Sequence, residues 1–120
     1  MSKLTNQQVF YKVVTALRLQ GAKSLLNPDN GSLACAYRSP DGKKCAAGHI
    51  IPDELYSPEM ESKNPFGIPA FADLVENLTF LNDLQYAHDN YNVEDWEECW
   101  KELAKQYNLK YEPKTTHTTA

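Results

Sequence analysis

The sequence predicts an α+β fold in which three or four helices pack around one β-hairpin. Two observations carry this prediction: long segments with apolar residues at helical spacing, and a reverse-turn signal at Ser39–Gly42 between two short β-like flanks. With 120 residues, 42% of them hydrophobic, the chain suits a single domain over residues 1–112. Residues 113–120 are polar and are expected to form a disordered tail.

The first predicted helix covers residues 6–20. Thr5 is a typical N-cap, and Gln8 three residues later completes a capping box. Gly21 is expected to end the helix in the left-handed conformation that glycine adopts without strain. The apolar face of this helix consists of Val9, Phe10, Val13, Val14 and Leu17.

The predicted hairpin pairs residues 32–38 with residues 43–47. Pro40 at the second position of the turn, followed by Asp-Gly, is a strong reversal signal. After the hairpin we expect one helical turn from about Cys45 to Ile51. Further short helical turns are expected to begin near Pro52 and Pro58.

The second half of the chain is predicted to be helical. Residues 69–90 are compatible with one long helix or with two helices separated near Asn77. The last helix is expected to begin after Asn92, which can cap it, and to stop near Asn108. The largest expected core residues are Phe10, Val14, Leu17, Phe71, Leu78, Leu81, Trp96, Trp100 and Leu103.

Composition argues against several classes of function. No run approaches the roughly 18 apolar residues of a membrane span, and the N-terminal residues lack the apolar stretch of a signal peptide. We therefore expect a location in the cytosol. The net charge of −4 and the scattered glycines disfavour nucleic-acid binding and a phosphate-binding loop.

Charge is unevenly distributed along the chain. Between Lys63 and Lys101 there is no lysine or arginine. The negative charge of this segment either offsets the positive charge of the first 44 residues in the folded protein or marks an interaction surface. The favoured hypothesis is a small cytosolic interaction or regulatory protein that binds a protein partner through acidic residues. The candidate binding residues are Asp89, Glu94, Asp95, Glu97 and Glu98.

The alternative hypothesis is a thiol enzyme centred on Cys45. A helical turn that begins near Cys45 would favour its thiolate, with His49 or His88 as the base and Asp89 to orient the base. Adjacent helical residues point about 100° apart, which makes Asp89 a poor partner for its own neighbour. A core hydrophobe is the commoner role for a single cysteine.

A zinc enzyme or a structural zinc site is the other variant of this alternative. Cys35, Cys45, His49 and His88 are its candidate ligands. Nine residues separate the two cysteines, however, whereas structural zinc sites usually have about two to four between paired ligands. We therefore expect no cofactor.

One block of the sequence resembles a known family. The segments Cys35–Arg38, Asp41–Gly48, Ile51–Glu54 and Tyr56–Glu61, with the later Leu84-Gln85 and His88-Asp89, are similar to a block found in small uncharacterised proteins of bacteria and their bacteriophages. The resemblance extends to about residue 111. It implies a bacterial or phage cytosolic setting, and it assigns no catalytic or binding residue. The hypothesis of a phage-encoded modulator of a host process depends instead on the small size, the lack of a catalytic signature and the acidic stretch from Asp73 to Glu98.

Overall fold

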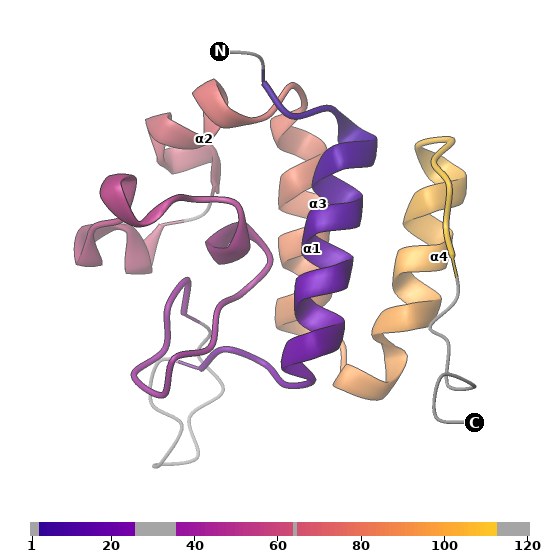
Figure 1. The fold of residues 1–120 in the computed structure, drawn as a ribbon, viewed down its shortest axis with the longest axis horizontal. Coiled ribbons are helices and arrows are strands. Elements are labelled where there is room, and N and C mark those ends of the chain that lie inside the picture. The colour runs from indigo at the N-terminus through magenta and orange to yellow at the C-terminus, as the bar shows by residue number, and fades with distance from the viewer. Residues whose placement is uncertain (1–2, 26–35, 64, 113–120) are drawn as a thin grey trace.

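The computed structural model describes residues 3–25, 36–63 and 65–112, and this part of the chain is all-α (Figure 1). Its α-helices are α1 (Asn6–Gln20), α2 (Pro69–Leu74), α3 (Leu78–Asn90) and α4 (Trp96–Gln106). Single turns of 3₁₀ helix are η2 (Ala47–His49), η3 (Asp53–Leu55), η4 (Pro58–Ser62), η5 (Pro65–Gly67) and η6 (Val93–Asp95). The predicted tail and Cys35 lie outside the described residues.

Helix α3 is the centre of the arrangement. It contacts α1, α4 and the turns η2 and η5. Helices α1 and α3 run in the same direction, and α4 returns antiparallel to them (Figure 1). The short helical segments between α1 and α3 gather on the side of the molecule opposite α4 (Figure 1).

The prediction for α1 is confirmed at both ends. Thr5 accepts a hydrogen bond from the backbone N–H of Gln8, and the Gln8 side chain accepts one from the backbone N–H of Thr5, which completes the capping box. Gly21 ends the helix with φ 66°, and its N–H donates to the carbonyl of Leu17. Local sequence chemistry is therefore sufficient to define this helix.

The predicted hairpin is wrong. Within the described residues, this region contains one isolated antiparallel bridge, between Arg38 and Lys44, and no strand. The reverse turn does form, with Gly42 at φ 89° and its N–H donating to the carbonyl of Ser39. The α+β prediction is therefore corrected to an all-α architecture for the described part of the chain.

The N–H groups of Ser39 and Cys45 do donate across the predicted pairing, to the carbonyls of Lys43 and Tyr37. The pairing does not extend into strands, because the other two backbone groups of the Tyr37–Cys45 pair have different partners. The N–H of Tyr37, which an extended ladder would direct to the carbonyl of Cys45, donates to the carboxylate of Glu61 at 2.8 Å. The carbonyl of Cys45 accepts from the N–H of His49 at 3.1 Å. The second flank thus enters the helical turn η2, which confirms the turn expected over residues 45–51.

The segment from residue 69 to residue 90 forms two helices. Asn77 caps α3 by accepting from the N–H of Phe80 at 3.1 Å. The break is reinforced from the N-terminus, because Leu4 donates to the carbonyl of Leu74 and accepts from the N–H of Glu76. The backbone of Leu4 therefore pairs with the chain just where α2 ends.

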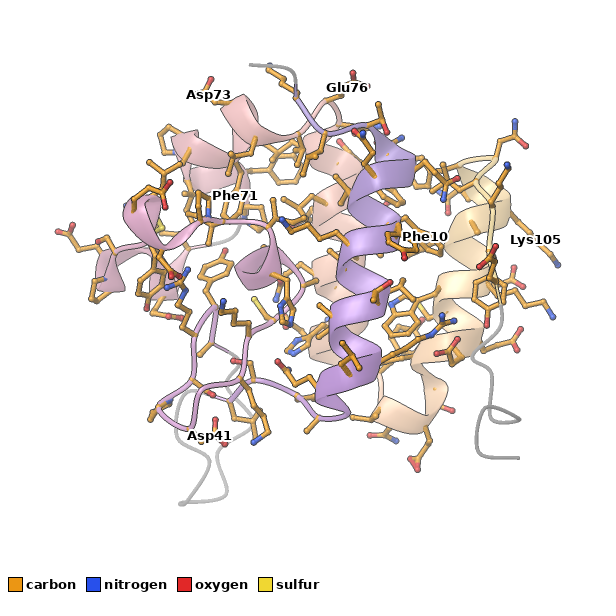
Figure 2. The ribbon with its side chains drawn as sticks, in the orientation of Figure 1. Phe10, Asp41, Phe71, Asp73, Glu76 and Lys105 are labelled. Carbon is orange, nitrogen blue, oxygen red and sulfur yellow. The ribbon has the colours of Figure 1, made fainter. Side chains whose placement is uncertain are left out.

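The core follows the predicted apolar stripes. Phe10 and Phe71, labelled in Figure 2, are buried, as are the two tryptophans of α4. Of the expected core residues, Leu78 alone is only half-buried, and it still packs against the buried cluster. Phe80 of α3 connects α1 with the end of α4, since its ring centroid lies 6.3 Å from that of Phe10 and 4.6 Å from that of Tyr107.

Candidate functional site

Cys45 is a buried, protonated thiol. Its side chain is 1% exposed, and its sulfur accepts a hydrogen bond from the backbone N–H of Gly48 at 3.3 Å. Burial raises the pKa of the Cys45 thiol well above its usual range. A thiol in this environment has little thiolate character, so the geometry does not support Cys45 as a nucleophile.

His88 is fully buried with both ring nitrogens engaged. Its Nε2 accepts from the backbone N–H of Ser24 at 3.1 Å, so Nδ1 carries the proton and lies 2.8 Å from Asp89 Oδ1. The expectation that Asp89 is a poor partner for His88 is wrong. Asp89 Oδ1 also accepts from Gln85 Nε2 at 2.8 Å, and the His88 ring stacks on Trp96. These groups join α3 to Ser24 and the core, and they leave His88 no free nitrogen for catalysis or metal binding.

His49 is partly buried and neutral. Burial, together with the nearby positive charge of Lys44, lowers its pKa to about 4. Its Nε2 is buried without a hydrogen-bond partner. Within residues 3–25, 36–63 and 65–112, no group of three or more histidine, cysteine, aspartate or glutamate side chains is arranged to hold a metal ion. Cys35, the remaining candidate zinc ligand, lies outside those residues.

Residues of the segments 36–38 and 53–61 form a network around Glu61. This carboxylate accepts from the backbone N–H groups of Tyr37 and Arg38, at 2.8 and 3.2 Å, and from the hydroxyl of Tyr56. The Arg38 guanidinium lies over the Tyr56 ring and pairs with Asp53 at 2.8 Å. These residues therefore fasten the chain between α1 and η4, which gives the network a structural role.

The predicted acidic residues divide into two groups. Asp89 belongs to the His88 network, and Glu97 binds Arg18 through both carboxylate oxygens at 2.7 Å. The others are exposed at the start of α4, where acidic side chains stabilise the helix N-terminus. The exposed members are Glu94, Asp95 and Glu98.

A groove lies between α3 and α4, on the side of α4 that carries Cys99. Its volume is about 280 Å³. Cys99 and Leu103 contribute its apolar lining, and burial raises the pKa of the Cys99 thiol. The lining residues are Asp83, Tyr86, Tyr91, Cys99, Glu102, Leu103 and Gln106.

Two exposed tyrosines line this groove. Tyr86 is 59% exposed and Tyr91 is 41% exposed, and their rings meet edge to face with centroids 6.4 Å apart. Sequence reasoning missed both residues. The available signal was that Tyr86 falls outside the apolar stripe through Leu81 and Leu84, so that a large aromatic ring occupies the polar side of an amphipathic helix.

The groove also carries two carboxylates and no basic lining residue. Asp83 accepts from the hydroxyl of Tyr107 at 2.6 Å through Oδ2, which leaves lone pairs on its carboxylate for a second donor. Glu102 lies 3.7 Å from Lys105, an exposed ion pair near the outer limit of contact. Such a pair contributes little and leaves Glu102 accessible. Carboxylates and aromatic rings together make this groove suited to a cation.

Two other cavities of the described region border α1. One, of about 380 Å³, lies between α1 and the segment that follows α4. The side chain of Gln7 hydrogen-bonds the backbone N–H and carbonyl of Lys110, and Arg18 donates to the carbonyl of Glu112, so both residues hold that segment against α1. The other, of about 250 Å³, lies between α1 and the start of α4 and includes the Arg18–Glu97 pair. Arg18, which lines both cavities, binds Glu97 and the carbonyl of Glu112.

Comparison of this chain with protein-family models, with curated proteins and with solved structures finds no match. Among the described helices, none is both long enough and apolar enough to cross a membrane.

Proposed function

We propose that this chain is a small interaction protein whose α3–α4 groove binds a basic segment of a partner protein. The observation that carries the proposal is the exposed pair Tyr86 and Tyr91 beside the carboxylates of Asp83 and Glu102. Tyrosine is among the residues that contribute most to protein interfaces, because its ring buries a large area at a small cost in entropy.

Charge supports a basic partner. No lysine or arginine occurs between Lys63 and Lys101, and exposed carboxylates of Glu94, Asp95 and Glu98 add negative charge around the start of α4. Complementary charge speeds association and disfavours acidic competitors. The resemblance to proteins of bacteria and bacteriophages supports a setting in the bacterial cytosol, where binding of this kind would modulate a host process.

The proposal is tested with a fluorescein-labelled peptide of alternating arginine, lysine, glycine and serine, whose binding is followed by fluorescence anisotropy. The double variant Asp83→Asn/Glu102→Gln should weaken binding about tenfold, because two exposed charge pairs of roughly 0.7 kcal/mol each are lost. Asparagine at position 83 keeps an acceptor for the Tyr107 hydroxyl.

A matched control removes the same charge elsewhere. Asp73 and Glu76 are exposed at the α2 edge of the molecule, outside the groove (Figure 2). The double variant Asp73→Asn/Glu76→Gln should change the affinity by less than about twofold. Equal losses in the two double variants would mean that net charge alone attracts the peptide, and the groove would be the wrong site.

A further inference from the structure

The chain holds Arg38 with one aromatic ring and one carboxylate. The guanidinium carbon of Arg38 lies 4.5 Å from the centroid of the Tyr56 ring, and its NH1 lies 2.8 Å from Asp53 Oδ1. The flat, delocalised cation thus places its face on the ring and its edge on the carboxylate.

Arg18, in the last turn of α1, is also held by a carboxylate and aromatic rings. Its Nε and NH2 donate to the two oxygens of Glu97, each at 2.7 Å. Its guanidinium carbon lies 5.8 Å from the ring centroid of Tyr111 and 5.9 Å from that of Trp100. Both arginines are therefore held by a carboxylate and at least one aromatic ring.

The lining of the α3–α4 groove contains the same kinds of side chain, aromatic rings and carboxylates, and no arginine. Tyr86 and Tyr91 supply the rings, Asp83 and Glu102 supply the carboxylates, and no basic side chain lines the groove. We infer, resting on the proposed function, that the groove recognises an arginine side chain of the partner. The guanidinium would stack on a tyrosine while its edge donates to a carboxylate.

Lysine should be the poorer ligand. Its ammonium is compact and strongly hydrated, so it cannot cover a ring face and donate two parallel hydrogen bonds to one carboxylate at the same time. The inference therefore predicts a preference among cations, which general attraction to a negative surface does not produce.

The test uses three peptides that are identical except for one central residue, which is arginine, lysine or citrulline. Citrulline keeps nearly the shape of arginine but carries no charge. Titrated into the full chain and followed by isothermal calorimetry, the arginine peptide should bind at least about fivefold more tightly than the lysine peptide. The citrulline peptide should bind more weakly than either.

Two tyrosine variants test whether the groove is the source of the preference for arginine. Tyr86→Leu should lower the affinity for the arginine peptide to that for the lysine peptide, because the attraction between charges remains while the aromatic ring face is lost. Tyr11→Leu is the matched control, since Tyr11 is also an exposed helical tyrosine (68%) but lies on α1. It should leave the preference unchanged.

The outcomes separate the inference from the proposed function. Equal affinity for the arginine and lysine peptides overturns the inference while the groove remains a basic-segment site. Loss of the preference in Tyr11→Leu as well as in Tyr86→Leu also overturns it. Absence of binding by both cationic peptides overturns the proposed function together with the inference.

Discussion

Gly48→Ala is the sharpest perturbation of the fold that the structure offers. A Cβ at residue 48 would lie 2.1 Å from the carbonyl oxygen of Tyr37 and 3.3 Å from the Cβ of Lys44. Gly48 does not have a positive φ, so the penalty is steric and not conformational. The substitution therefore tests the close approach of η2 to Tyr37 and Lys44, which flank the reverse turn.

The expected loss of stability in Gly48→Ala is large because the atoms around residue 48 have little room to move. Carbon and oxygen ordinarily approach to about 3.3 Å, so the Tyr37 carbonyl or η2 must shift by roughly 1 Å. The carbonyl also accepts from the N–H of Cys45, and its neighbours are buried. Overpacking typically lowers the free energy of unfolding by about 1–3 kcal/mol. We expect about 3 kcal/mol for Gly48→Ala, because the new Cβ meets a backbone carbonyl and not the end of a flexible side chain. For a domain of this size that corresponds to a decrease of about 12 °C in melting temperature.

Gly21→Ala is the control for this measurement. Gly21 has φ 66° and no heavy atom within 4 Å of a built Cβ, so alanine there meets only backbone strain of about 1 kcal/mol, or about 4 °C. Thermal unfolding followed by circular dichroism measures both variants. If Gly48→Ala lowers the melting temperature no more than Gly21→Ala does, the close packing of η2 against Tyr37 is refuted.

Three further predictions concern polar groups of the interior. His88→Phe keeps the stacked ring but removes the acceptor of the Ser24 N–H, and it should lower the free energy of unfolding by about 2 kcal/mol in urea; an unchanged midpoint would contradict the network. The folded-state pKa of His49, about 4, lies below the unfolded value of 6.5, so the unfolded state binds more protons between these values. Stability should therefore fall as the pH is lowered from 7 to 4, and His49→Gln should flatten that slope; an equal slope in both proteins would exclude His49 as its source. A double-mutant cycle of Arg18→Gln and Glu97→Gln, measured on the free energy of unfolding, should give a coupling energy of about 1–2 kcal/mol between the two side chains. If the effects of the two substitutions are additive, the Arg18–Glu97 pair does not stabilise the fold.

Local chemistry explains which elements the sequence could predict. The capping box at Thr5 and the left-handed Gly21 involve residues within one turn of each other, and α1 was predicted completely. The hairpin was predicted on equally good turn chemistry, and the turn formed. What the turn could not reveal was Glu61, more than twenty residues away, whose carboxylate takes the backbone N–H of Tyr37. Residue patterns do not show where such a distant side chain lies.

The candidate site was harder to predict, for a related reason. Reactive residue types drew attention to Cys45 and His88, yet the fold uses both as buried, hydrogen-bonded members of the core. The groove depends on the angle at which α3 meets α4, and this angle is not encoded in either helix alone. Its one sequence-level trace was Tyr86 on the polar side of α3.

The central claim is that the α3–α4 groove binds a basic segment. The most direct test is a titration of ¹⁵N-labelled full-length chain with the single-arginine peptide, followed by amide chemical shifts. If the peptide binds in the groove, the shifts concentrate on Tyr86, Tyr91, Cys99 and Glu102, and they saturate with one dissociation constant. Shifts confined to α1, or spread evenly over every exposed acidic residue, would contradict the claim.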